Sequence, residues 1–159
     1  MAILISLAIA CMLLIFAIAL YNYILDNIFI KQFQESKIAK EKVELRLTQS
    51  LRSICELLNI PLTYHEQLGD AAGKIVYHHN SLDRLILDHA YIEIINECKE
   101  RPYVLAHEIG HYMAIKQRND VTEEGADKEA LVLCKSILTQ EEQDILDISL
   151  NVYFNSNAV

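Results

Sequence analysis

Two histidines and a glutamate stand at a spacing that suits metal chemistry. The segment VLAHEIGHYM places His107, Glu108 and His111 in an HExxH pattern. On a helix, residues four apart lie one turn above each other, so both imidazoles can address one metal ion. The carboxylate of Glu108 lies beside them, where it can take a proton from a water at the metal. The pattern predicts two metal ligands and one general base.

The site needs a further protein ligand, and an acidic segment follows the histidines at a workable distance. Eleven residues separate His111 from Glu123, which opens the sequence EEGAD. This separation allows one helix, a short turn and a second helix that returns across the first. Glu123 can then complete a His₂Glu zinc site, with Glu124 as the alternative ligand. Asp127 shares the face of Glu123, and we expect it to accept the outer N–H of a ligand histidine and fix its tautomer.

The number of ligands indicates what kind of metal site to expect. A structural zinc site is closed by four protein ligands, whereas His107, His111 and Glu123 supply three and leave one position open. Gly110 and Ala126 are small where two helices must come close enough to share an ion. We therefore expect a catalytic zinc site. The alternative is a regulatory or binding module with a structural or inactive zinc site, because a domain of this size leaves little room for a substrate cleft.

Helices around the motif must position these residues. The apolar pattern predicts a helix that begins at Pro102, where proline suits a first turn, and a turn at residues 118–120. A second helix is predicted over about residues 121–138. The last helix begins at Thr139, where Thr-Gln-Glu-Glu forms a capping box in which Glu142 reaches back to the cap.

An amphipathic helix and a small sheet precede the motif. Between Gln32 and Leu58 there is neither proline nor glycine. An apolar stripe recurs there at intervals of four, three and four, at Leu47, Leu51, Ile54 and Leu58, which predicts an amphipathic helix that ends before Pro61. The expected fold class is α+β, mainly helical with a short sheet of about three strands. The β-prone runs GKIVY, LILD and YIEII begin at Gly73, Leu85 and Tyr91.

The N-terminal segment is almost wholly apolar. Residues 2–25 carry no charged side chain, and these 24 residues at about 1.5 Å each span about 36 Å, more than a hydrocarbon core of about 30 Å. We expect a transmembrane helix that contacts membrane lipid through residues 2–25. Lysines follow this segment and neither lysine nor arginine precedes it. The positive-inside rule then predicts a single-pass membrane protein with its C-terminal domain in the cytoplasm.

Charge and length limit the partners and the domain organisation. The 159 residues carry a net charge of −8, and residues 61–159 hold 8 basic and 17 acidic side chains. Direct nucleic-acid binding is not expected, because phosphate binding needs a basic surface. We expect a transmembrane segment at 1–25, a juxtamembrane segment and amphipathic helix at 26–60, and the metal-site domain at 61–159.

Beyond the bare motif, HEIGH followed by Glu-x-x-Ala-Asp resembles the gluzincin group of zinc peptidases. HtpX-like membrane quality-control proteases share both motifs, but they carry several membrane spans and a longer catalytic domain. The order of segments is similar to the ImmA/IrrE family of metallopeptidases over about residues 40–138. The similar segments are a leading helix into LLNIPLTYH, then GKIVY and LILD, then RPYVLAHEIGHYM, and finally EEGADKEALVLCKSIL.

The resemblance implies a zincin-like metallopeptidase domain in residues 61–159. It implies that His107, His111 and Glu123 bind Zn²⁺ and that Glu108 is the catalytic base. Members of the ImmA/IrrE family cleave or inactivate regulatory proteins, often repressors. The implied activity is hydrolysis of peptide bonds in a protein substrate of this kind. A donor that stabilises the developing oxyanion is also expected, and the candidates are Tyr77, His78, Tyr103 and Tyr112.

Overall fold

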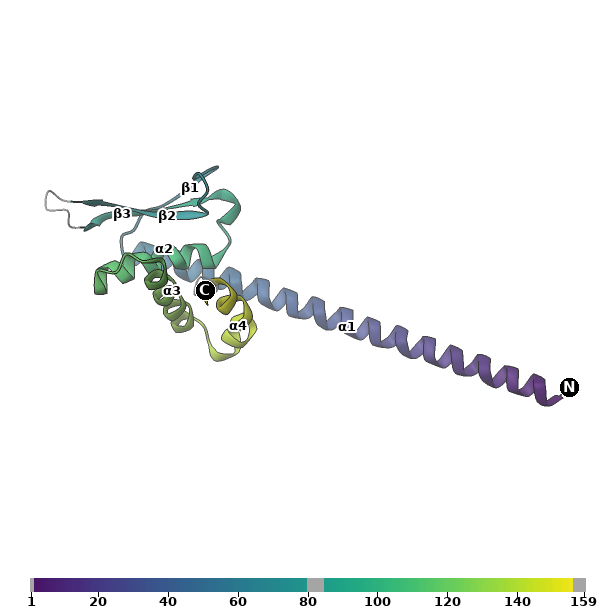
Figure 1. Cartoon of the computed structure of the whole chain (residues 1–159). Coiled ribbons are helices and arrows are strands. Elements are labelled where there is room, and N and C mark those ends of the chain that lie inside the picture. The colour runs from purple at the N-terminus through teal and green to yellow at the C-terminus, as the bar shows by residue number, and fades with distance from the viewer. Residues whose placement is uncertain (1, 80–84, 156–159) are drawn as a thin grey trace. The chain divides into compact units, whose positions relative to one another are not determined.

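Helices and one small sheet make up the described part of the chain (Figure 1). The computed structural model describes the backbone of residues 2–79 and 85–155, and their side chains except at 2–15, 17, 78–79, 85–86, 88 and 155. The prediction of an α+β fold is confirmed. The helices are α1 (Ala2–Leu57), α2 (Pro102–Arg118), α3 (Glu123–Ile137) and α4 (Gln140–Asn155), with a short 3₁₀ helix η1 (Asn96–Cys98); the strands are β1 (Leu62–His65), β2 (Gly73–His79) and β3 (Leu85–Ile95).

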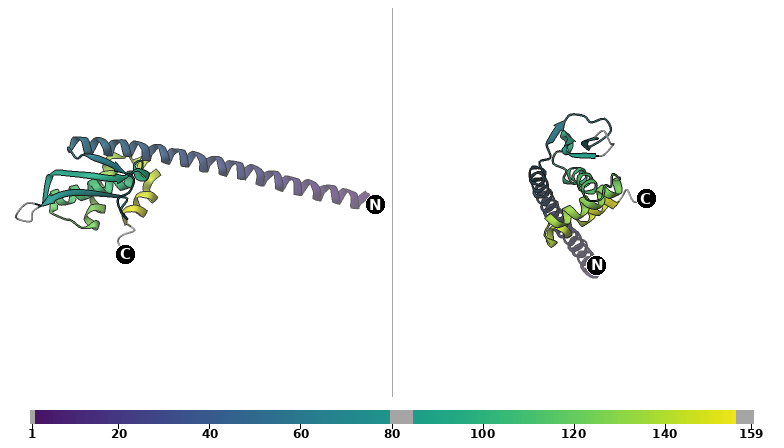
Figure 2. Two further views of the ribbon diagram at one scale, coloured as in Figure 1. Left: turned by 90° about the horizontal axis from the view of Figure 1, so that it is seen from above. Right: turned by 90° about the vertical axis from the view of Figure 1, so that its left-hand side faces the viewer.

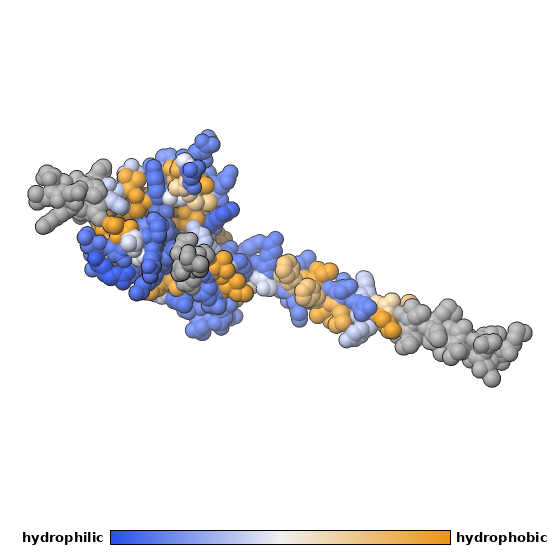
Figure 3. Space-filling view, in the orientation of Figure 1, coloured by the Kyte–Doolittle hydropathy of each residue, from blue (hydrophilic) through white to orange (hydrophobic). Residues whose placement is uncertain are grey.

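The predicted transmembrane helix at residues 2–25 is wrong. In the part of the chain that the structure describes, no helix combines the length and the apolar character needed to cross a bilayer. Polar groups at Asn22, Asp26 and Lys31 interrupt the apolar residues of α1, and Figure 3 shows both kinds of residue mixed along this stretch. The side chains of residues 2–15, where the predicted span begins, lie outside the described residues.

The chain divides into two units, Met1–Ala39 and Lys40–Val159. The second unit contains the end of α1, the sheet and the three shorter helices. Within it, α2 lies between the sheet on one side and α3 on the other (Figures 1 and 2). This layering places one face of α2 against β2 and leaves another to meet α3.

The sheet has the order β1-β3-β2, so β2 is an edge strand. β1 pairs with β3 in parallel, and β2 pairs with β3 antiparallel, with Ile75 opposite Ile92. The two strands predicted at Leu85 and Tyr91 are one strand, β3, because the buried alternation of Ala90, Ile92 and Ile94 continues across that boundary. β1 was not predicted.

The core is one cluster of buried side chains from the sheet, α2, α3, α4 and the last turns of α1. Leu47 and Leu51 of the predicted stripe on α1 are fully buried, while Ile54 is only half-buried. Three residues of α4, spaced four apart, are buried in the same core: Leu146, Leu150 and Phe154. The helical period therefore predicts which side of each of these helices is buried.

The capping box at the start of α4 is confirmed. The backbone N–H of Thr139 donates to Glu142 Oε2 at 2.9 Å, and the N–H of Glu142 donates to Thr139 Oγ1 at 3.4 Å. Nε of Arg46, on α1, donates to Glu142 Oε1 at 2.6 Å. The cap thus begins α4 and also attaches it to α1, which sets where the far end of α4 lies.

Candidate metal centre

The helix α2 positions the HExxH residues. Pro102 occupies its first turn, where a missing N–H costs nothing. The helix ends at Asn119, whose left-handed conformation, with φ of 56°, reverses the chain towards α3. His107 and His111 lie one turn apart on α2, with ring centroids 4.7 Å from each other. They therefore share one face, as the spacing predicts.

The helix α3 begins next to this face. Thr122 is its N-cap, and its hydroxyl accepts a hydrogen bond from the N–H of Gly125 at 3.0 Å. Gly110 of α2 lies directly against the backbone of Ala126. This close approach brings Glu123, the first residue of α3, over the two histidines.

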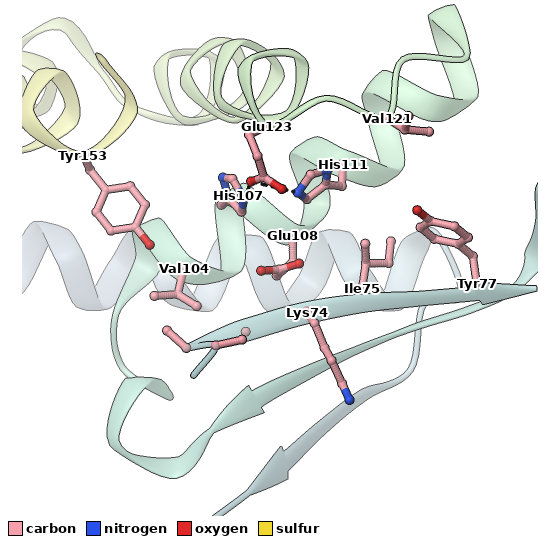
Figure 4. A pocket seen from close by; sticks show the side chains of 13 residues that line it. Lys74, Ile75, Tyr77, Val104, His107, Glu108, His111, Val121, Glu123 and Tyr153 are labelled. Carbon is pink, nitrogen blue, oxygen red and sulfur yellow. Dashed lines mark ion pairs between the residues drawn. The ribbon is translucent and has the colours of Figure 1, made fainter. Parts of the chain in front are cut away.

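Two nitrogens and one carboxylate oxygen converge at one point (Figure 4). Glu123 Oε2 lies 3.0 Å from His107 Nε2 and 3.5 Å from His111 Nε2. One ligand atom from each residue falls within 4.8 Å of the other two. Glu124 is exposed and does not belong to this group. The donor set fits a three-ligand zinc site with an open position, which is the pattern of catalytic zinc sites.

Asp127 holds one of the ligand histidines. Its Oδ1 lies 2.7 Å from His107 Nδ1, and only 4% of Asp127 is exposed. A carboxylate at this position fixes the proton on Nδ1, which leaves Nε2 of His107 as the lone-pair donor towards the metal. Asp127 thus lies where the sequence predicts a residue that orients a histidine.

Replacing Asp127 by Asn is expected to weaken zinc binding by about 10–100-fold, because the amide is a poorer acceptor for the imidazole N–H. Zinc affinity measured by competition with a chromophoric chelator checks this result. Glu129→Gln is the matched control, because Glu129 is also a buried acid of α3 but pairs with Arg118 at 2.6 Å. Equal zinc affinity of Asp127→Asn and the natural chain would contradict the orienting role.

Glu108 is buried beside the three converging residues. It is 5% exposed, and burial raises the pKa of its carboxyl to about 7. The N–H of Ile75, on β2, donates to this carboxylate. Gly73 allows β2 to pass this close, since a Cβ there would lie 2.9 Å from Val104 Cγ1 and 3.1 Å from Glu108 Oε1.

A cleft of about 460 Å³ opens over these residues, between α2 and β2. Two tyrosines line it, Tyr77 from β2 and Tyr153 from α4. Of the predicted oxyanion donors, Tyr103 and Tyr112 do not line the cleft, and the side chain of His78 lies outside the described residues. Tyr153 was missed, because no motif marks it and only the packing of α4 brings it to the site.

Comparisons with protein-family models, with curated proteins and with solved structures found no match for the chain.

Proposed function

We propose that the protein is a zinc-dependent endopeptidase that hydrolyses peptide bonds of a protein substrate. The observation that carries this proposal is the convergence of His107, His111 and Glu123 next to the buried carboxylate of Glu108. Three ligands and an adjacent base are what metal-assisted hydrolysis requires, and a structural zinc site would need a fourth ligand and no base.

Each residue of the site has a role in this reaction. Zinc, when bound, supplies a Lewis acid that polarises the scissile carbonyl and acidifies a water molecule. Glu108 accepts the proton as the water oxygen bonds to the carbonyl carbon, and it returns a proton to the amine that leaves. Burial keeps the pKa of Glu108 near 7 in the metal-free chain, which suits a group that both takes and gives a proton. A neighbouring divalent cation favours its charged, basic form.

The cleft supports a peptide as the substrate. It runs beside β2, the edge strand of the sheet, and its lining includes Gly73, Ile75 and Val104. An extended chain can lie along such an edge with its backbone groups near the strand and its side chains in the apolar parts of the cleft. The excess of acidic residues in 61–159 favours a substrate with a basic surface, such as a regulatory protein that binds nucleic acid.

Removal of the metal tests the proposed function. The full chain, purified with zinc, is expected to contain about one zinc per chain and to cleave members of a fluorescence-quenched peptide library. Chelation is expected to abolish cleavage, and added Zn²⁺ is expected to restore it, because the water is activated only at the metal. Zinc content and initial rates are measured on the same samples. Cleavage that survives complete loss of zinc, or bound zinc without any cleavage, would exclude a zinc peptidase.

A further inference from the structure

A tyrosine outside the HExxH and EEGAD segments reaches the cleft. Tyr153 belongs to α4 and lines the same cleft as His107, Glu108 and Glu123. Figure 4 shows its side chain extending from α4 towards Glu108, at the end of the cleft opposite Tyr77. A third helix therefore adds a hydrogen-bonding group to a site that α2, α3 and β2 otherwise provide.

Aromatic packing holds the Tyr153 ring in place. It stacks on Tyr103 with ring centroids 5.5 Å apart and 30° between the planes, and Phe154 meets it edge-on at 5.1 Å. Phe154 is a buried core residue, and the Tyr103 hydroxyl donates to Glu44 Oε1 of α1 at 2.9 Å. The hydroxyl of Tyr153 is thus positioned before any substrate arrives, which is what an electrostatic contribution to catalysis requires.

The hydroxyl of Tyr153 keeps its proton at neutral pH. Burial raises its pKa above the ordinary value, and the negative charges of Glu108 and Asp127 raise it further. The neutral group is a hydrogen-bond donor beside Glu108 and Glu123, whose carboxylate oxygens are acceptors. A donor is what the scissile carbonyl oxygen needs, because that oxygen gains negative charge when water attacks.

We propose that the Tyr153 hydroxyl donates a hydrogen bond to the carbonyl oxygen of the scissile bond as that oxygen becomes negatively charged. This assignment rests on the proposed peptidase function. Tyr103 and Tyr112 do not line the cleft, and their hydroxyls contact Glu44 and, at 3.4 Å, Lys116 Nζ. Tyr77 lines the other end of the cleft and is the rival donor.

Kinetics of Tyr153→Phe test the assignment. The variant keeps the ring and its stacking and loses only the hydroxyl, so kcat is expected to fall by about 10²–10³-fold with KM nearly unchanged. The probe is the quenched peptide that the natural chain cleaves fastest, and zinc content is measured in parallel. Tyr112→Phe is the matched control, because its hydroxyl lies outside the cleft, and natural rates are expected for it.

Binding of a transition-state mimic gives a second measurement that does not depend on turnover. A phosphinic analogue of the same peptide carries a charged oxygen where the substrate has its carbonyl, and Tyr153→Phe is expected to bind it about 100-fold more weakly. The uncleaved peptide, titrated into proteins that also carry Glu108→Gln, is expected to bind equally with and without the Tyr153 hydroxyl. A selective loss for the analogue supports transition-state donation.

Three outcomes overturn the assignment. The first is that Tyr153→Phe has the same kcat and the same affinity for the analogue as the natural chain, while the natural chain is active. The second is a large loss of kcat in Tyr77→Phe with little loss in Tyr153→Phe, which assigns the donor to the other end of the cleft. In both of these the peptidase function stands. The third is the absence of cleavage by the zinc-loaded natural chain, which removes the peptidase function itself.

Discussion

Glu108→Gln is expected to lower the rate of peptide cleavage by about 10³-fold or more while zinc stays bound, because the amide cannot accept the proton of the attacking water. The three converging ligand atoms belong to His107, His111 and Glu123, so this change leaves the metal site intact. The amide keeps the shape of the carboxyl, and its oxygen can still accept the hydrogen bond from the N–H of Ile75. The loss is therefore chemical and not structural.

Two measurements separate the loss of the base from damage to the fold. Zinc content of the Gln variant is expected to match that of the natural chain. Burial raises the pKa of Glu108 in the metal-free folded chain, so its charged form opposes folding. The stability that the protonated form contributes is lost as the pH rises from the ordinary carboxyl pKa, which Glu108 has in the unfolded chain, to its folded pKa of about 7. The neutral Gln variant, freed of zinc, is therefore expected to be at least as stable as the natural chain at pH 8.

Glu124→Gln is the matched control for this experiment. Glu124 is an acid of the same segment, but it is exposed and lies outside the group of converging ligands. Cleavage by this variant is expected to equal that of the natural chain. Cleavage by purified Glu108→Gln at more than about a tenth of the natural rate would remove the assigned base.

The natural substrate can be sought in cells. Cells that express the natural form are compared with cells that express Glu108→Gln, and protein fragments that appear only with the natural form identify the substrate.

The site was predictable where it depends on local periodicity. A spacing of four on a helix brings His107 and His111 to one face whatever the rest of the fold does. The return of a second helix was predicted from the length of the connection, and the structure adds the detail that Asn119 turns the chain and Thr122 caps α3. Short-range patterns of this kind are present in the residues themselves, so they can be read without a structure.

The parts that sequence reasoning missed depend on tertiary contacts. Tyr153 reaches the cleft only because α4 is held by the pairing of Glu142 with Arg46 and by the packing of Leu146 and Leu150. β1 is a strand of four residues of which the last three are exposed, so no alternation of apolar and polar residues marks it in the sequence. The N-terminal prediction rested on the apolar run at residues 2–25, and the helix that the structure describes there includes polar groups at Asn22, Asp26 and Lys31.

The contact between α2 and α3 at Gly110 is the feature on which the metal site depends most. A Cβ at Gly110 would overlap the carbonyl oxygen of Ala126 and lie 3.0 Å from its carbonyl carbon and 3.1 Å from the N of Ala130. These atoms all belong to the backbone of α3, so no side-chain rotation can relieve the overlap. Gly110 therefore allows α3 to lie close enough for Glu123 and Asp127 to reach the histidines of α2.

Gly110→Ala is accordingly expected to destabilise the metal-free chain by about 2 kcal/mol and to weaken zinc binding. Overpacking costs about 1–3 kcal/mol and more against backbone, which outweighs the gain of up to about 1 kcal/mol from helix propensity. Thermal unfolding is expected at a temperature lower by about 5–10 °C. Zinc affinity falls in the same variant because a displaced α3 carries Glu123 away from His107 and His111.

Gly125→Ala is the matched control for Gly110→Ala. It gives α3 a gain in helix propensity, and its Cβ would lie against the carboxylate of half-buried Asp120. That side chain can rotate away, unlike the backbone at Gly110, although it then gives up its hydrogen bonds from the N–H and hydroxyl of Thr122, a loss that the gain in propensity offsets. Its unfolding temperature is expected to stay within about 3 °C of the natural value. If Gly110→Ala unfolds no earlier than Gly125→Ala and binds zinc as tightly, then α2 and α3 do not meet backbone to backbone at this position. In that case Glu123 would need some other support to reach the histidines, and the three-ligand site would lose its structural basis.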